Sequence, residues 1–316
     1  MANPAYDLTR TACPACGGRL APWIDVPAGE PSDSRDFPLG RCAACGTAVT
    51  QGDLPGPQAY EEGVYAPGAP RAAPMVRTIQ RLTVGQPTRI LTRAGLGPGA
   101  RVLDAGAGRG RLVTELRRRG FAAEGIEPSA RSAGAAAGAG LAVARRSIDE
   151  HEDSGLDAVV LWHVLEHLDD PASALERVRS WLRPGGLVLV GVPNVGSLQA
   201  RIAGPAWMHF DVPRHRLHLT PGGLRSLFDR SGLEPGPVDH MVWEHNPAAM
   251  WMALLSRAGM SPAYPFHLLK RNAPARGRDL ALAIGGLPLL GVAVAMEAAA
   301  AAVGRGGTIA ALARVS

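Results

Sequence analysis

A glycine-rich turn directly after an apolar run constrains this chain more than any other feature. Residues 102–110 have the sequence Val-Leu-Asp-Ala-Gly-Ala-Gly-Arg-Gly, which predicts a buried strand, a tight turn and then a helix. Glycines in such a turn let the backbone bend sharply and approach a ligand closely. A glycine pattern alone also fits an ordinary strand-to-helix turn, so its meaning depends on the residues around it.

Short apolar runs alternate with helical stretches between Arg101 and Asn194. The clearest runs cover residues 156–163 and 186–194. Such alternation predicts an α/β fold with a mainly parallel sheet that is covered by helices on both faces. A further strand is expected near 238–244, and a final strand at 308–315.

Two acidic residues stand at the predicted strand ends. Asp104 follows the first strand, where a carboxylate would repel a pyrophosphate but attract an ammonium group. Glu127, about 20 residues further on, ends the next strand, where an acid can accept hydrogen bonds from both ribose hydroxyls. Together they favour a nucleoside ligand without phosphates, and S-adenosylmethionine (SAM) carries both an ammonium and a cationic sulfur.

From about Met75 onward, these motifs resemble the class I SAM-dependent methyltransferases. The glycine spacing is G-x-G-x-G, not the G-x-G-x-x-G of dinucleotide enzymes. The resemblance implies a Rossmann-like, doubly wound, mainly parallel seven-stranded sheet with SAM as the cofactor. It assigns Asp104, Gly106, Gly108 and Gly110 to the methionine part, Glu127 to the ribose, and Asp149 to the adenine amino group, with Glu150 and Asp153 as neighbouring alternatives. Pro128 is a further predicted cofactor-binding residue.

The segment 161–168, Leu-Trp-His-Val-Leu-Glu-His-Leu, resembles the region after the fourth strand of many small-molecule methyltransferases. Its His163-x-x-Glu166-His167 pattern also matches a zinc-protease helix. That motif needs a long helix, whereas His163 ends a run of strand type. We therefore expect His163 to face the sulfonium or the substrate.

Residues 207–215 contain a D-x-P-R-H pattern that resembles a segment of enzymes from natural-product, sugar and lipid pathways, and it is expected to cover the substrate. Methyl transfer requires an aligned nucleophile and, in many cases, removal of its proton, a task that suits histidine near neutral pH. For each histidine, a purely structural role is an equal alternative. The general-base candidates are His163, His167 and His215, and the substrate-contact candidates are Tyr65, Asp211, Arg214 and His245.

Four cysteines form two C-x-x-C pairs near the N-terminus, Cys13 with Cys16 and Cys42 with Cys45. Thiolates at this spacing bind one tetrahedral zinc ion, although the 25 intervening residues exceed the usual length. Redox thiols or an iron–sulfur cluster are the alternatives. Four thiolate ligands leave no open position, so the zinc would be structural.

The predicted organisation is a zinc ribbon at 1–50, a linker or lid at 51–74 that carries Tyr65, and a methyltransferase domain at 75–316 with an apolar helical insertion at about 245–303. Within the insertion, residues 280–296 form 17 residues without a charge, which is short for a membrane span. We expect a buried helical pair, with a dimer contact or a peripheral membrane contact as alternatives. The N-terminus lacks the apolar core of a signal peptide, which predicts a cytoplasmic protein with reduced cysteines.

The leading functional prediction is a SAM-dependent methyltransferase that modifies an oxygen or carbon of a small molecule. The alternatives are an RNA-directed methyltransferase that docks through its ribbon, and a SAM-binding protein without activity. The net charge of +5 comes from scattered arginines, since Lys270 is the only lysine. Scattered charge argues against a dedicated nucleic-acid surface. The oligomeric state is left open.

Overall fold

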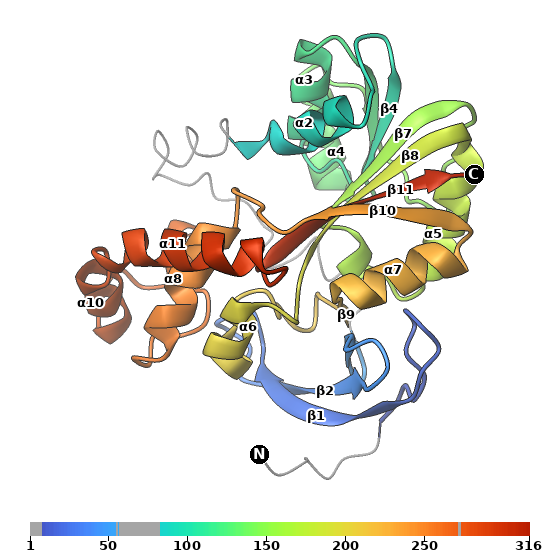
Figure 1. The fold of residues 1–316 in the computed structure, drawn as a ribbon. Helices are drawn as coiled ribbons and strands as arrows, with labels where there is room; N and C mark the ends of the chain where they lie inside the picture. The colour runs from blue at the N-terminus through green and yellow to red at the C-terminus, as the bar shows by residue number, and fades with distance from the viewer. Residues whose placement is uncertain (1–7, 55, 57–82, 271–272) are drawn as a thin grey trace.

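The computed structural model describes residues 8–54, 56, 83–270 and 273–316, and its centre is a seven-stranded sheet (Figure 1). Residues 156–162 show why the chain folds this way, because their side chains point alternately to the two faces and are buried on both. The strands are β4 (Arg101–Ala105), β5 (Ala122–Ile126), β6 (Val143–Ala144), β7 (Leu156–Trp162), β8 (Leu182–Pro193), β10 (Leu233–Asp239) and β11 (Thr308–Val315).

The strand order is β10-β11-β8-β7-β4-β5-β6, and β11 runs in the direction opposite to the other six strands. From β4 the chain first extends the sheet to one side, through β5 and β6, and then returns to place β7 on the other side. Such a reversal opens a crevice at the carboxyl ends of the central strands, where α/β proteins bind ligands. This mainly parallel, doubly wound α/β fold confirms the predicted fold class.

Helices cover both faces of the sheet (Figure 1). On one face, helices α2, α3 and α4 pack against Ala158 and Val160 of β7. On the other face, helices α5 and α7 pack against Val159 and Leu161. These helices are α2 (Gln86–Arg93), α3 (Arg111–Arg118), α4 (Ala130–Gly138), α5 (Pro171–Trp181) and α7 (Pro221–Arg230).

The cysteine-bearing ribbon belongs to a second, four-stranded sheet of order β1-β2-β3-β9. Its last strand comes from the methyltransferase part of the chain, because Leu217 and His218 pair with Val49 and Ala48. The ribbon therefore shares a sheet with the domain that follows it. The strands are β1 (Leu20–Pro27), β2 (Asp36–Cys42), β3 (Ala48–Thr50) and β9 (Leu217–His218).

A helical arm lies between β10 and β11 in the chain and projects beside the sheet (Figure 1). Among the described residues, no helix alone has the length and apolar character of a membrane span; α10 and α11 meet these criteria only as a pair, which is bent by 73°. The arm consists of α8 (Asn246–Ser256), α9 (Tyr264–Leu269), α10 (Arg278–Gly285) and α11 (Leu289–Ala302), and α6 (Leu198–Ala203) packs against it.

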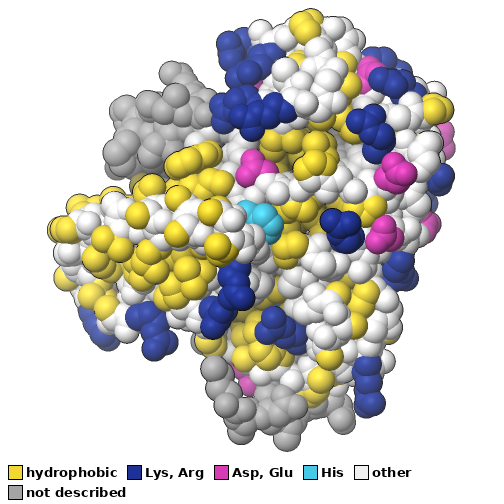
Figure 2. All heavy atoms as spheres, viewed as in Figure 1, with side chains coloured by type: hydrophobic (Ala, Val, Ile, Leu, Met, Phe, Trp, Pro, Cys, Tyr) yellow, Lys and Arg dark blue, Asp and Glu magenta, His cyan; other side chains and the backbone are white. Residues whose placement is uncertain are grey.

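The expected burial of residues 280–296 is wrong for much of the run. Ala293 is buried, but Ile284, Leu287 and Val292 are about half exposed. Helix α11 packs on its neighbours through a narrow stripe of Ala293, Glu297 and Ala300, and its other faces remain open. Figure 2 shows the apolar side chains that gather along this arm.

Candidate active site

The glycine turn follows β4, and its conformation requires glycine. Gly106 has φ +87°, and a Cβ there would collide with Val164 Cγ2. Gly110 has φ +74°, and its Cβ would meet Leu141 Cδ1 at 2.6 Å. Gly108 also has a positive φ, yet a Cβ there would meet no atom within 4 Å. The turn is thus packed on two sides and open at Gly108, as a close ligand approach requires.

Asp104 lies in β4 just before this turn, with 3% of its surface exposed. Burial, reinforced by the charge of Glu127, raises the pKa of Asp104 to about 7. A buried carboxylate with a second acid nearby is suited to a ligand that brings its own positive charge. The ammonium group of SAM fits this requirement.

Glu127 ends β5 next to the turn. Its Oε2 accepts a hydrogen bond from the Gly108 amide at 2.9 Å, and its Oε1 accepts one from the Ser129 amide at 2.9 Å. These bonds hold the carboxylate at the carboxyl edge of the sheet, beside Asp104. Pro128 follows it and is exposed. The structure thus brings together the residues predicted for the methionine and ribose parts.

Asp149 is not part of this group. Its side chain is 80% exposed and pairs with Arg177 of α5 at 3.2 Å. Of its neighbours, Glu150 accepts hydrogen bonds from Ser147. Asp153 pairs with Arg101 at the amino end of β4, opposite the cofactor edge. The predicted adenine contact remains a prediction.

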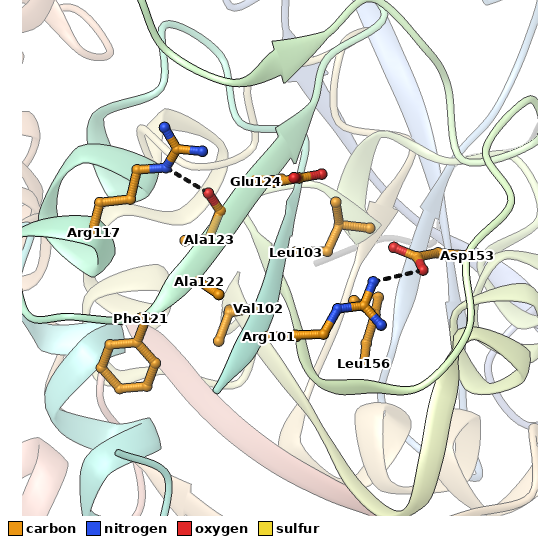
Figure 3. Close-up of a pocket in the computed structure, with 10 residues that line it drawn as sticks. All are labelled: Arg101, Val102, Leu103, Arg117, Phe121, Ala122, Ala123, Glu124, Asp153 and Leu156. Atoms are coloured by element: carbon orange, nitrogen blue, oxygen red, sulfur yellow. Dashed lines mark hydrogen bonds and ion pairs between the residues drawn. The ribbon is translucent and has the colours of Figure 1, made fainter. Parts of the chain in front are cut away.

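A cavity of about 340 Å³ opens at that opposite edge (Figure 3). Arg101, Phe121 and Leu156 line it, and the Arg101–Asp153 ion pair lies across its rim. Because Arg101 begins β4 whereas Asp104 and the glycine turn end it, this cavity is separate from the cofactor edge.

A cluster of histidines adjoins the glycine turn, and Val164, which packs on Gly106, links the two. Ring centroids of His163 and His245 are 4.7 Å apart, and those of His167 and His215 are also 4.7 Å apart. All three predicted base candidates therefore lie together. The histidine cluster comprises His163, His167, His209, His215, His218 and His245.

Glu166 is a buried acid that binds His163 of this cluster. Its carboxylate is buried, yet its pKa falls to about 2, because the hydrogen bond and charge of His163 outweigh the desolvation. His163 Nδ1 donates to Glu166 Oε1 at 3.0 Å, and this partner raises the pKa of His163 against the effect of burial. Burial lowers the pKa of His167 to about 4 and that of His245 to about 3. At neutral pH the latter two are neutral imidazoles, which can accept a proton.

Asp211 and Arg214 bind each other. Arg214 donates two hydrogen bonds to the Asp211 carboxylate, and its Nη1 lies 3.8 Å from Glu30 Oε2 in the ribbon. Against the effect of burial, Arg214 and His215 lower the pKa of Asp211. The pair braces the segment that carries His215, while contact of either residue with a substrate remains a prediction.

The four cysteine sulfurs converge at one end of the ribbon. Cys13 Sγ lies 3.7 Å from Cys45 Sγ, and Cys16 Sγ lies 3.5 Å from Cys42 Sγ. All four sulfurs lie within 4.8 Å of one another. Four thiolates that bind one zinc ion at about 2.3 Å stand about 3.8 Å apart, so the set fits that ion.

The ribbon also holds the histidine cluster. The Thr50 hydroxyl donates to the His215 carbonyl at 2.7 Å and lies 3.0 Å from His218 Nε2. The Thr220 hydroxyl donates to the Cys45 carbonyl at 2.6 Å. Thr50, His209 and His218 were not among the predicted site residues. No local motif marks Thr50, whose contacts with His215 and His218 cross 165 and 168 residues of chain.

The zinc-protease alternative does not fit this geometry. Residues 165–167 form a single 3-10 turn, and His163 precedes it with φ +56°. His163 binds the Glu166 carboxylate through Nδ1 and does not face one ion together with His167. Tyr65 lies outside the described residues, so its predicted position over the cofactor remains a prediction.

An open parallel sheet with a glycine turn and two acids at its switch point defines a nucleotide-binding α/β protein. The methyltransferase domain family matches residues 77–236, which is half of the chain. An O-methyltransferase of ubiquinone biosynthesis from Dinoroseobacter shibae is 31% identical over 173 residues, covering 50% of this chain and 69% of that protein. A protein of the same name from Cereibacter sphaeroides is 29% identical over 188 residues, covering 55% and 75%.

Solved structures resemble the chain more distantly. A SAM-dependent methyltransferase from Archaeoglobus fulgidus has a TM-score of 0.48 at 16% identity and covers 74% of this chain and 94% of its own. Magnesium protoporphyrin IX methyltransferase from Synechocystis, with bound SAM, has a TM-score of 0.41 at 17% identity and covers 55% and 79%. From the family match and the sequence relatives, the chain belongs to the methyltransferase domain family, and it is a SAM-dependent methyltransferase.

Proposed function

We propose that this enzyme transfers the methyl group of SAM to a hydroxyl oxygen of an apolar small molecule. Its relatives from D. shibae and C. sphaeroides are named O-methyltransferases of ubiquinone biosynthesis, which favours oxygen over carbon as the acceptor atom. The observation that best supports this proposal is the histidine cluster beside the glycine turn. Neutral, buried imidazoles at the cofactor edge suit the removal of a hydroxyl proton during an in-line displacement at the sulfonium methyl.

In this proposal Asp104 binds the ammonium of SAM and Glu127 binds its ribose. Gly108, the open position of the turn, lets the methionine part lie against the backbone. SAM supplies the electrophilic methyl group, and the protein aligns the acceptor and excludes water. His245, a neutral histidine of the cluster, takes the acceptor proton, while His163, which shares a proton with Glu166, keeps that carboxylate in place.

We propose that the four cysteines bind one structural zinc ion. The support is the convergence of their sulfurs at distances that tetrahedral coordination needs. The ribbon packs on the methyltransferase core, where Cys13 and Cys42 share an apolar cluster with Leu227. This use of the ribbon as internal support disfavours the RNA-docking alternative, which needs a free, basic ribbon face.

We further propose that the helical arm rests on an anionic membrane surface, where an apolar acceptor would be found, and that the enzyme is otherwise cytoplasmic. Leu287 and Leu290 are exposed beside the break between α10 and α11. Arg257, Arg276 and Arg278 are exposed on the same arm. Apolar side chains flanked by arginines suit insertion into the headgroup region of anionic lipids.

Cofactor choice is tested by calorimetric titration of the zinc-replete protein with SAM, S-adenosylhomocysteine and NAD. Micromolar binding of the first two and none of NAD is expected. Transfer of labelled methyl from SAM to a panel of phenols, catechols and hydroxylated isoprenoids then tests the acceptor. Labelling of carbon or nitrogen acceptors in preference to hydroxyls would contradict the proposal.

Membrane contact is tested by co-sedimentation with phosphatidylglycerol vesicles. Leu287→Glu should reduce the bound fraction several-fold, because it places a charge in the apolar surface. The matched control is Val303→Glu, which adds the same charge at a 71% exposed valine beyond the end of α11. Equal binding of both variants would exclude the membrane contact.

A further inference from the structure

Two side chains of the histidine cluster and the neighbouring Glu166 converge in a way that removal of the acceptor proton does not explain. Glu166 and His167 belong to the 3-10 turn after β7, and His215 belongs to the segment before β9. One ligand-type atom from each lies within 4.8 Å of the other two. Glu166 and His215 are buried, and His167 is half-buried.

Both imidazoles bind a backbone carbonyl through the same nitrogen. His167 Nδ1 lies 3.1 Å from the Arg214 carbonyl oxygen, and His215 Nδ1 lies 2.8 Å from the His209 carbonyl oxygen. A carbonyl oxygen can only accept, so in the neutral form of each ring Nδ1 carries the hydrogen and Nε2 carries the lone pair. Metal-bound histidines are held in this way, with one nitrogen on a backbone carbonyl and the other on the ion.

Glu166 supplies the third donor. It is 1% exposed, and its Oε1 accepts the hydrogen bond from His163. Its Oε2 is buried and receives no hydrogen bond within the described part of the chain. A buried carboxylate oxygen without a donor is costly, and a cation placed against it removes that cost. His163 thus has the supporting role that second-layer groups have around metal-bound carboxylates.

We propose that Glu166, His167 and His215 bind a divalent transition-metal ion, with zinc the expected occupant, at a site separate from the four-cysteine ribbon. Two imidazoles and one carboxylate match the ligand set of zinc sites that keep one position open. An acceptor hydroxyl bound at that position would ionise more readily. This last role rests on the proposed O-methyl transfer, whereas the binding of the ion does not.

Metal analysis of the full-length protein, purified from zinc-supplemented medium, tests the site. The wild type should contain about two zinc equivalents per chain, one in each site. Glu166→Gln and His215→Ala should each contain about one. The matched control is His218→Ala, a buried histidine of the same cluster whose Nε2 binds Thr50 and which offers no ligand to this point. It should keep both equivalents.

Cobalt substitution identifies which site is lost. In the wild type, the ribbon equivalent should give intense thiolate-to-cobalt charge-transfer bands, and the second equivalent should give only the weaker bands of nitrogen and oxygen ligands. Glu166→Gln should lose the second set and keep the first. SAM titration and circular dichroism of each variant show that the domain is folded.

Two results would overturn the site. One is a wild-type content of about one equivalent, all of it with thiolate bands; the other is a loss of metal in His218→Ala equal to that in His215→Ala. Neither measurement requires an acceptor. A protein that binds the second ion but methylates no hydroxyl would therefore refute the proposed function and leave the metal site standing.

Discussion

The glycine turn and the histidine cluster touch each other, yet the chain builds them in opposite ways. The proposed cofactor-binding residues of the turn region all lie between Asp104 and Pro128, within one strand–helix–strand unit. The cluster draws its histidines from three separate stretches around residues 163, 215 and 245, and the ribbon holds one of them through Thr50. The proposed cofactor site is therefore built from residues close together in the sequence, whereas the proposed acceptor site is built from distant ones.

Loss of the ribbon zinc should have the largest effect, because it should disturb the histidine cluster and leave the glycine turn intact. Cys42→Ser removes one of four converging thiols, and the ribbon should unfold because such small metal modules depend on their ion. The His215 segment then loses Thr50 and β3, so turnover should fall by about 100-fold or more. SAM affinity, measured by calorimetry, should change by less than about 3-fold. Retained turnover without zinc would show that the cluster does not need the ribbon.

Asp104→Asn tests the glycine-turn region. It removes the charge that attracts the ammonium of SAM, and the affinity should fall by about 1–3 kcal/mol, or about 5-fold to 150-fold. The zinc content should not change, since Asp104 lies on β4, away from the ribbon. Calorimetry and metal analysis on the same preparation check both outcomes, and unchanged affinity would mean that the cofactor lies elsewhere.

The pH dependence of stability gives an independent test of Asp104. Its pKa of about 7 in the folded state exceeds the unfolded value of 3.8, so the folded protein binds the proton more tightly. Stability without ligand should therefore fall as the pH rises from about 4 to about 7 and stay low above that range. Asp104→Asn should raise the Tm at pH 8 and leave it nearly unchanged at pH 4. A lower Tm at pH 8 would place a cation beside Asp104.

Thr50→Val should have a moderate effect, confined to the link between ribbon and cluster. The valine matches threonine in shape but leaves the His215 carbonyl and His218 Nε2 without their partner. A loss of about 1–3 kcal/mol in the free energy of unfolding is expected, with turnover reduced more than SAM affinity. Thr50→Ser keeps the hydroxyl and serves as the control in the same denaturation experiment. Equal stability of the two variants would show that the hydroxyl does not hold the segment.

Asp149→Ala should have the smallest effect. The residue is 80% exposed, and its ion pair with Arg177 is a surface contact. SAM affinity should change by less than about 2-fold, consistent with the known weakness of such pairs. A larger loss would establish the predicted adenine contact and would mean that the loop closes on the bound cofactor.

The fold could be predicted because its signals are local. Apolar runs of strand length, separated by glycine and proline, specified the parallel sheet, and 308–315 is the observed β11. The errors concern a strand and a helix whose position and burial depend on tertiary packing. A strand expected near 238–244 lies instead at Leu233–Asp239, where β11 supplies its hydrogen-bond partners. The burial of 280–296 was overestimated, because hydropathy does not tell which apolar faces find a neighbour.

By itself, the sequence determined the cofactor edge and the four-cysteine set, because glycine conformation, strand-end acids and C-x-x-C spacing act over a few residues. It also identified His163, His167 and His215 one by one. Only the tertiary structure decided that these histidines meet, that Glu166 lies among them, and that β9 joins the ribbon sheet. Contacts between residues 50 and 215 depend on how the two sheets pack, and no short stretch of sequence encodes that packing.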